Sequence, residues 1–345
     1  MASHRRPKQP SRTRVTVLTT AAAAAVALSA NAADAAPREK LGKDEVKAKV
    51  DKLYEQAEQA TEKYNGAKEK QQKLQKEIST LQDGVARGQQ DLNKLRDGLG
   101  SLATAQYRSG GIDPSVQLFL SSDPDDFLDK ASTLDQLSGQ QVEALKKIQD
   151  RQRELTQERA EATEKLKDLA ATRTELGGKK KEVQSKLAAA QKLLNTLTAK
   201  EKAALATEQA RADRSATQRV DLGDAGSASG RASAAFAAAQ SQLGKPYVYG
   251  ATGTASYDCS GLTSWAYAQA GVSLPRTSEA QTGAGTRLTR GQLQVGDLVF
   301  FFNDLHHVGL YAGNGQILHA PRTGTVVRYE SMDTIGGPFM FGVRV

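Results

Sequence analysis

Two long runs of apolar residues, spaced alternately by four and three positions, constrain this chain more than any other feature. The first run covers residues 46–102 and the second covers 145–197, with Glu, Lys and Gln filling the positions between. This spacing is typical of the seam of an α-helical coiled coil. The first run lapses at Gly88, and the pair Gly177-Gly178 predicts a local weak point in the second.

The segment between the two runs, residues 107–130, contains glycines, prolines and the apolar stretch "VQLFL". These residues end the first helix and predict a small structured tip. We therefore expect residues 37–214 to form a long antiparallel hairpin, with arms of roughly 100 Å at 1.5 Å per residue. Heptads alone fix neither partner nor direction, so parallel self-association stays an alternative.

The first 36 residues have the layout of a secretory signal peptide. Five Lys/Arg residues precede an alanine-rich apolar stretch, and small residues follow up to an expected cleavage site after Ala35. An uncleaved membrane anchor is the alternative, although the apolar stretch is short and weakly hydrophobic for a span. Secretion with retention at the cell wall is the expected localisation.

The net charge of +8 does not indicate a nucleic-acid-binding protein. Residues 1–36 carry five Lys/Arg and one acidic residue, so half of the excess lies in the predicted leader. The remainder is spread along the chain without a concentrated basic stripe, which suits proximity to an anionic envelope better than phosphate binding. We expect no nucleic-acid partner.

The last third of the chain differs in composition from the rest. Thirteen of the 18 aromatic residues lie beyond residue 230, after a Gly/Ser/Ala-rich segment at 215–230 that reads as a flexible linker. Residues 231–345 are therefore the part able to build a compact core, with helices first and strands afterwards, which predicts an α+β domain with an antiparallel sheet. The expected helices lie at 234–244 and 260–270, and the expected strands at 296–302, 307–313, 315–320, 325–330 and 339–345.

The chain has one cysteine, Cys259, placed directly before the predicted helix at 260–270. A helix N-terminus favours negative charge and lowers a thiol pKa, which would prepare the sulfur for nucleophilic attack. An inert buried cysteine is the alternative, but an unpaired thiol outside the cell is open to oxidation unless it has a use. Asp258 before it suits a helix cap or a substrate contact.

Three histidines lie downstream of the cysteine. His307 begins one predicted strand and His319 lies near the end of the next, so an antiparallel pairing can bring their rings side by side. One ring could then take the thiol proton while the other orients it. No spacing typical of a metal site supports a metal, and no cofactor is expected.

Several segments beyond residue 234 resemble the NlpC-type cell-wall cysteine peptidases, which have a papain-like core. The matching segments are "GKPYVYGATGTASYDCSGLTSWAYAQAG", "LPRTSEAQ", "GDLVFF", "HHVGLYAGNGQILHAP" and "FGVRV". The resemblance implies that Cys259 is the nucleophile, that His307 rather than His306 is the base, and that His319 is the third catalytic residue.

The same resemblance implies roles for three further residues: Tyr247 in the oxyanion or substrate site, and Asp258 and Ser260 in binding the free end of a peptide. It implies an endopeptidase that cuts peptidoglycan stem peptides between D-isoglutamate and the diamino acid, in wall remodelling or daughter-cell separation. Glu279 departs from the family pattern by adding a charge, which leaves the preference of the peptide groove open.

The helical region is similar to the hairpins of division-associated wall hydrolases, which implies a membrane division complex of the FtsX type as a partner. A hairpin that blocks the catalytic groove and one that is only a spacer both fit this pattern. Two other functions stay open: a wall-binding adaptor with a degenerate peptidase domain, and an amidase or acyltransferase using the same three residues.

Overall fold

The computed structural model describes residues 41–108, 116, 124–217 and 230–345. The predicted signal peptide, most of the predicted tip and most of the predicted linker lie outside the described residues. Among the helices that are described, none contains a stretch long and apolar enough to cross a membrane.

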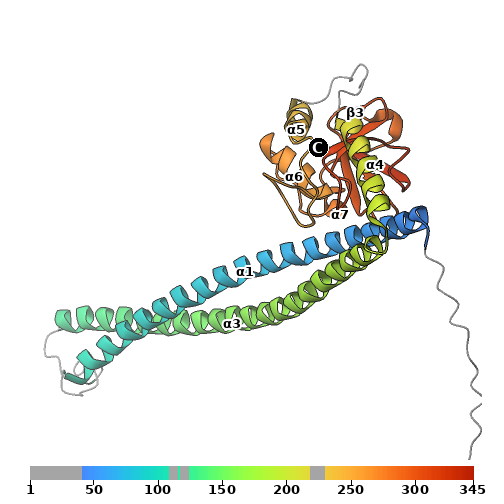
Figure 1. Cartoon of the computed structure of the whole chain (residues 1–345). Helices are drawn as coiled ribbons and strands as arrows, with labels where there is room; N and C mark the ends of the chain where they lie inside the picture. Colours follow the sequence, from blue (N-terminus) through green and yellow to red (C-terminus); the bar gives the residue numbers. More distant parts are fainter. Residues whose placement is uncertain (1–40, 109–115, 117–123, 218–229) are drawn as a thin grey trace, which may run out of the picture. The chain divides into compact units, whose positions relative to one another are not determined.

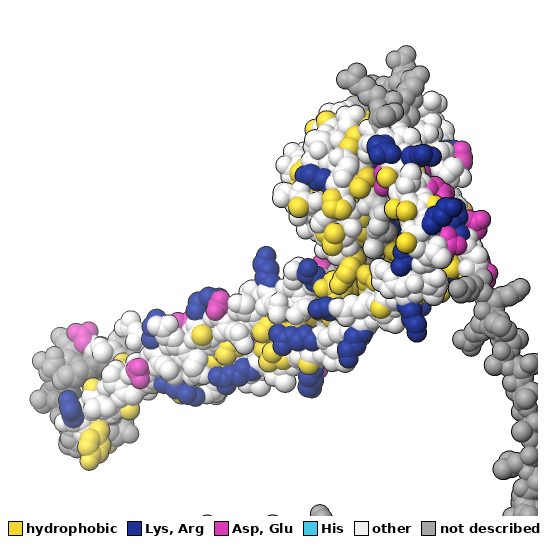
Figure 2. Space-filling view, in the orientation of Figure 1, with side chains coloured by type: hydrophobic (Ala, Val, Ile, Leu, Met, Phe, Trp, Pro, Cys, Tyr) yellow, Lys and Arg dark blue, Asp and Glu magenta, His cyan; other side chains and the backbone are white. Residues whose placement is uncertain are grey.

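The two apolar runs form two long helices that pair side by side (Figure 1). Helix α1 spans Lys43–Arg108 and helix α3 spans Pro124–Leu194. Lys165 of α3 donates to Glu77 of α1 at 2.7 Å, and Lys186 donates to Gln56 at 2.8 Å, so residue numbers rise on one helix as they fall on the other. The predicted antiparallel hairpin is therefore present. On the face seen in Figure 2, Lys and Arg side chains are scattered along it rather than gathered in one patch.

The buried hydrophobic residues of the hairpin are predicted seam positions. They include Val46, Val50, Ala57, Ala60, Ala67, Leu74, Ile78 and Leu92 on α1, and Ile148, Leu155, Leu169, Val183 and Ala190 on α3. A Cβ at Gly88 would lie 2.5 Å from Arg151 Nη2 and 2.7 Å from Leu155 Cδ2, so these two α3 side chains would have to shift to accept a larger residue. The expected weak point at Gly177-Gly178 does not interrupt α3.

A separate helix, α4 (Ala199–Thr217), follows the hairpin. The Thr198 backbone N–H donates to Glu201 Oε2 at 2.8 Å, and the Glu201 N–H donates to Thr198 Oγ1 at 3.3 Å, so the two residues form a capping box that starts the helix. The expectation of one hairpin reaching residue 214 missed this Thr-x-x-Glu signal.

The C-terminal part is an α+β domain built on one antiparallel sheet, as expected. The strand order is β1-β6-β2-β3-β4-β5, and each neighbouring pair is antiparallel. The strands are β1 (Thr286–Leu288), β2 (Leu298–Phe301), β3 (His307–Gly313), β4 (Gln316–His319), β5 (Arg328–Ser331) and β6 (Phe339–Arg344). Five of them overlap the predicted strands, whereas β1, with only three residues, was not predicted.

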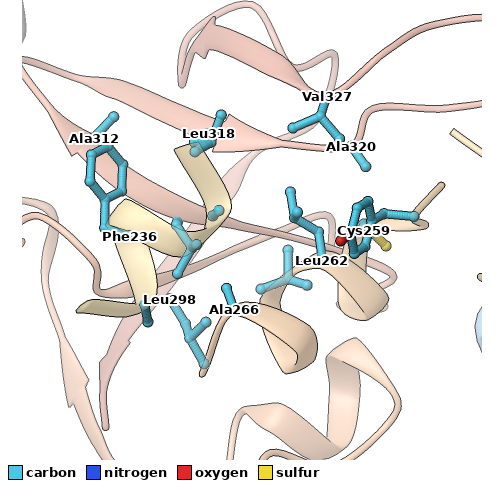
Figure 3. Packing of buried hydrophobic residues seen from close by; sticks show 14 of the residues in the cluster. Phe236, Cys259, Leu262, Ala266, Leu298, Ala312, Leu318, Ala320 and Val327 are labelled. Carbon is cyan, nitrogen blue, oxygen red and sulfur yellow. The ribbon is translucent and has the colours of Figure 1, made fainter. Parts of the chain in front are cut away.

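Helices α5 (Gly230–Gln240) and α6 (Cys259–Gln269) cover one face of this sheet. The short α7 (Ser278–Gln281) packs on α6, and a 3-10 turn spans Arg290–Gln292. Strand β2 is buried throughout because its alternate side chains enter two cores. Leu298 and Phe300 join the cluster beneath α5 and α6, while Val299 and Phe301 join a smaller cluster on the other face. Figure 3 shows part of the first cluster, including Cys259.

The turn before β2 requires glycine at position 296. Gly296 has φ +93°, and a Cβ there would lie 2.3 Å from the Ala232 carbonyl oxygen. Gly324 also has a positive φ, +87°, but a Cβ at that position meets nothing within 4 Å. Replacing Gly324 therefore tests backbone strain alone, whereas replacing Gly296 tests backbone strain together with steric overlap.

We predict that Gly324→Ala lowers the free energy of unfolding of this domain by about 1–2 kcal/mol, the cost of a left-handed non-glycine residue. Gly296→Ala should lower it clearly further, because the new methyl group displaces α5. Urea unfolding followed by near-UV circular dichroism measures both, and equal losses would contradict the packing account.

Candidate active site

Cys259 is the first residue of α6 and is fully buried. Asp258 caps this helix, since its Oδ1 accepts the Gly261 N–H at 2.7 Å. The local sequence Asp-Cys-Ser-Gly thus starts a helix with the sulfur in its first turn. A side chain at position 261 would lie 2.1 Å from the Ala251 carbonyl oxygen, so glycine is needed there for the preceding loop to pack against α6.

His307 and His319 lie side by side, brought together by the antiparallel β3 and β4. His307 Nε2 and His319 Nδ1 are 2.7 Å apart, and the rings meet edge to face at a centroid distance of 5.0 Å. One ring nitrogen of His307, the Cys259 sulfur and a Glu58 carboxylate oxygen all lie within 4.8 Å of one another. The structure thus groups the three residues that the sequence singled out.

The other residues singled out from the sequence surround this group. Tyr247 is buried, and burial followed by the charges of Glu58 and Cys259 raises its pKa well above 10. The neighbouring His306 has a different setting: its ring stacks on Phe302 at 4.1 Å, and only its carbonyl oxygen approaches the sulfur, at 3.7 Å.

The structure adds residues that the sequence analysis missed, on one face of α1. Tyr54, Glu58, Glu62 and Asn65 follow one another at steps of four, four and three, which places them on one side of a helix. Glu58, Glu62 and Asn65 are at most 7% exposed. This face of α1 lies next to the coiled-coil seam and packs on the α+β domain.

Glu58 binds the proposed base directly. Its Oε1 accepts from His307 Nδ1 at 2.5 Å. Because Nε2 of the same ring faces His319, Nδ1 is the nitrogen left for a thiol, and Glu58 occupies it. Burial alone lowers the pKa of His307, but the charge and hydrogen bond of Glu58 outweigh burial and raise it. Glu58 on α1 therefore favours the protonated form of His307.

Glu62 lies in a polar pocket next to the sulfur. Its Oε1 accepts from Ser260 Oγ at 2.7 Å, and its Oε2 accepts from the Ser278 N–H at 2.6 Å and the Ser278 hydroxyl at 2.9 Å. The Cys259 sulfur is 3.9 Å from Oε1. The pocket is shaped for a carboxylate, and a side chain of the same protein fills it.

Asn65 extends this contact to the helix cap. Its Nδ2 donates to Asp258 Oδ2 at 3.1 Å and to Glu62 Oε1 at 3.1 Å. Asp258 Oδ2 also accepts from Arg276 and from the Gly250 N–H. The Asn65 Oδ1 is buried without a hydrogen-bond partner among the residues described, so this amide is incompletely satisfied.

The cysteine differs from the expectation of a lowered pKa. Burial, then the charges of Glu62, Glu58 and Asp258, raises the pKa of the Cys259 thiol well above 9. Burial and the three carboxylates around the sulfur together outweigh the effect of the helix N-terminus, and two of the carboxylates come from α1. In this arrangement Cys259 is a neutral thiol.

Glu58, Cys259 and His307 are also the donor set that could hold a metal ion among the described residues. Carboxylate, thiolate and imidazole suit zinc. Glu58 and His307 are, however, joined by a direct hydrogen bond, and Glu62 and Ser260 satisfy each other. The negative charge of Glu58 is thus already paired with His307, one of the other two residues of this donor set.

Known proteins resemble the C-terminal part of the chain. Residues 244–340 match the model of the NlpC/P60 family. A protein of Corynebacterium glutamicum named "Probable endopeptidase Cgl2188" is 48% identical over 107 residues, which are 31% of this chain and 50% of that protein. "Probable endopeptidase p60" of Listeria innocua is 45% identical over 112 residues, 32% of this chain and 24% of that protein.

Among solved structures, the NlpC/p60 domain of the peptidoglycan hydrolase SagA aligns with 33% of this chain and 98% of that chain, at 32% identity and a TM-score of 0.31. The chain spans half or less of the length of the two curated relatives. The similarity therefore concerns the α+β domain and leaves the hairpin aside. The C-terminal part of this chain therefore contains an NlpC/P60 domain at residues 244–340, as the sequence motifs indicated.

Proposed function

We propose that the chain is a secreted peptidoglycan endopeptidase that cuts stem peptides between D-isoglutamate and the diamino acid. The observation that carries this proposal is the carboxylate of Glu62, bound next to the Cys259 sulfur by Ser260 and Ser278. A D-isoglutamyl residue joined through its γ-carbonyl keeps a free α-carboxylate close to the scissile bond. The Ser260 and Ser278 donors would hold that group while the γ-carbonyl faces the sulfur.

In the proposed reaction, His307 takes the proton of the Cys259 thiol, and the thiolate attacks the γ-carbonyl carbon. The Cys259 N–H and Tyr247 stabilise the oxyanion. The amine of the diamino acid leaves with the proton from His307, and water then hydrolyses the thioester. His319 orients His307 throughout.

We further propose that α1 keeps this site closed. Glu58 takes the nitrogen of His307 that the thiol needs, and Glu62 takes the carboxylate pocket of the substrate. Burying a carboxylate costs free energy unless it is paired. A hairpin that served only as a spacer would not require Glu58 and Glu62 to be buried against the site. In wall remodelling or daughter-cell separation, a membrane division complex of the FtsX type is the proposed partner that withdraws α1.

Closure by α1 carries a pH dependence. Burial and the charge of Asp258 raise the pKa of Glu62 from 4.5 to about 7, so between about pH 4.5 and 7 Glu62 takes up a proton when α1 closes. The raised pKa of His307 also favours the closed state at low pH. Both groups take up protons on closing, so closure is strongest below about pH 4.5 and weakens as pH rises through 7.

The first prediction concerns the reaction. With Glu58→Ala/Glu62→Ala in the full chain to open the site, purified peptidoglycan should yield fragments that end in D-isoglutamate, identified by mass spectrometry. Adding Cys259→Ala should reduce release by at least about 10³-fold. The same fragments from the cysteine variant would sink the proposal, and products cut at the sugar-peptide amide would favour an amidase.

The second prediction concerns closure. Glu58→Ala/Glu62→Ala should raise the rate of peptide release by about tenfold or more over the wild-type chain, because each removed carboxylate leaves a buried partner without its pair. The matched control is Glu69→Ala/Asp83→Ala, which removes the same charge from exposed positions of α1. Equal rates in both double variants would show that α1 does not close the site.

The third prediction is the titration of Glu62 itself. Carboxyl ¹³C NMR of the full chain, assigned with Glu62→Gln, should show a pKa of about 7. Ser278→Ala removes one hydrogen bond to the carboxylate and should raise that pKa, since fewer donors then stabilise the charged form. A midpoint near 4.5 would mean that Glu62 is solvated in solution and that α1 does not occupy the pocket.

A further inference from the structure

A carboxylate lies behind His319, on the side away from His307. In the register of β4 and β5, His319 pairs with Arg328, and Glu330 lies two residues further along β5. His319 Nε2 is 3.2 Å from Glu330 Oε2, while His319 Nδ1 is 2.7 Å from His307 Nε2. The three side chains therefore form a row that ends at Glu330.

Charge fixes the direction of the hydrogen bonds in this row. Burial raises the pKa of Glu330, but its hydrogen bond with His319 and the charge and hydrogen bonds of Arg328 outweigh burial and lower it, so Glu330 is ionised and can only accept. His319 Nε2 must then carry the hydrogen. Burial lowers the pKa of His319 to about 4, so the ring is neutral and its Nδ1 has a free lone pair.

That lone pair accepts the Nε2–H of His307, which leaves His307 Nδ1 as the nitrogen that receives the proton from the Cys259 sulfur. The opposite tautomer of His319 would donate from Nδ1 and require an unprotonated His307 Nε2. A neutral His307 would then carry its hydrogen on Nδ1 and could not take the thiol proton there.

We propose that Glu330 is a positioning residue that fixes the Nε2–H tautomer of His319 and so makes His307 Nδ1 the base for Cys259. This inference rests on the proposed cysteine-peptidase function. It adds to the Cys259, His307 and His319 group a fourth residue, which acts through His319 and does not touch the substrate.

Arg328 holds Glu330 in place and ties it to the helical part of the chain. Its Nε and Nη2 donate to Glu330 Oε2 at 3.1 and 2.6 Å, and its Nη1 donates to Asp213 of α4 at 2.8 Å. The guanidinium thus bridges two carboxylates. Because Arg328 fixes the same oxygen that accepts from His319, Glu330 cannot rotate away from the ring without losing both donors.

Charged and titratable groups from four elements act on His307. They are Glu58 and Glu62 on α1, Cys259 on α6, His319 on β4 and Glu330 on β5. His319 is in turn affected by His307, Glu330 and Arg328. In the Glu58→Ala/Glu62→Ala chain, Glu330 is the carboxylate of this set that remains to stabilise the His307 imidazolium.

The test compares Glu330→Ala and Glu330→Gln in the full chain. Long-range ¹H-¹⁵N spectra of histidine side chains report the tautomer in the Glu58→Ala/Glu62→Ala chain, where Glu58 no longer favours a protonated His307 that would itself fix the His319 tautomer, and they do so whether or not the chain is active. With Glu330 present, His319 should be protonated at Nε2, and adding Glu330→Ala should give a mixture of tautomers. Glu330→Gln, which still offers an acceptor oxygen, should keep more of the Nε2–H form than Glu330→Ala.

Kinetics on a soluble stem peptide are measured in the Glu58→Ala/Glu62→Ala background. Glu330→Ala should lower kcat by about 10- to 100-fold with little change in KM, as for other groups that orient a catalytic side chain. The acid limb of the kcat/KM profile, which reports the pKa of the base His307, should move to lower pH in both Glu330 variants, because the protonated ring loses a stabilising charge. Asp333→Asn, which removes an exposed carboxylate paired with Arg290, is the control and should change neither quantity.

An unchanged tautomer of His319 in Glu330→Ala would overturn the inference. So would a loss of kcat with an unmoved pH profile, which indicates a structural role alone. Absence of peptide cleavage in every variant, with the tautomer shift present, would instead count against the proposed function and leave the role of Glu330 in fixing His319 standing.

Discussion

The burial of Glu58 and Glu62 against Cys259 and His307 is the interaction on which the rest of the site depends. It decides the protonation of the sulfur, the charge of His307 and the occupant of the carboxylate pocket. Buried carboxylates are costly unless they are paired and hydrogen-bonded. Here His307 pairs with one, and Ser260 and Ser278 donate to the other. The same donors are those the proposed reaction would use.

The helical part contacts both ends of the row formed by His307, His319 and Glu330. At one end Glu58 binds His307 directly. At the other end Asp213 binds Arg328, which holds Glu330 against His319. A movement of α1 would free the base and the pocket, whereas α4 could stay in place and continue to support the orienting residues. On the proposal that α1 closes the site, the two helices have opposite effects: α1 blocks the base and the pocket, and α4 supports the residues that orient the base.

Much of the fold follows from the sequence because periodicity and turn residues are local signals. The apolar spacing predicted the heptad positions that are buried in the hairpin. The turn residues and local patterns predicted five of the strands and the helix that begins at Cys259. The pairing of His307 with His319 followed from two strands joined by a short turn. A three-residue strand such as β1 has too little pattern to be detected, since its pairing with β6 comes from distant sequence.

The residues that close the site could not be recognised in the same way. Glu58 and Glu62 are four positions apart on a charged helix, which is the ordinary pattern of a solvated coiled-coil face. Nothing local indicates that this face meets a domain some 200 residues later in the chain. The prediction of a lowered thiol pKa failed for the same reason: it used the helix N-terminus, which is local, and lacked the α1 carboxylates. Glu330 was hidden because its approach to His319 depends on the register of β4 and β5.

The central claim is that α1 buries Cys259 as a neutral thiol in the complete chain. Its most direct test is the second-order rate constant for alkylation of this single cysteine by iodoacetamide at pH 7, compared between wild type and Glu58→Ala/Glu62→Ala. The account predicts slow alkylation of the wild-type chain and a rate at least about tenfold higher in the variant, since both access and thiolate content increase. Rapid and equal alkylation of the two chains would contradict it.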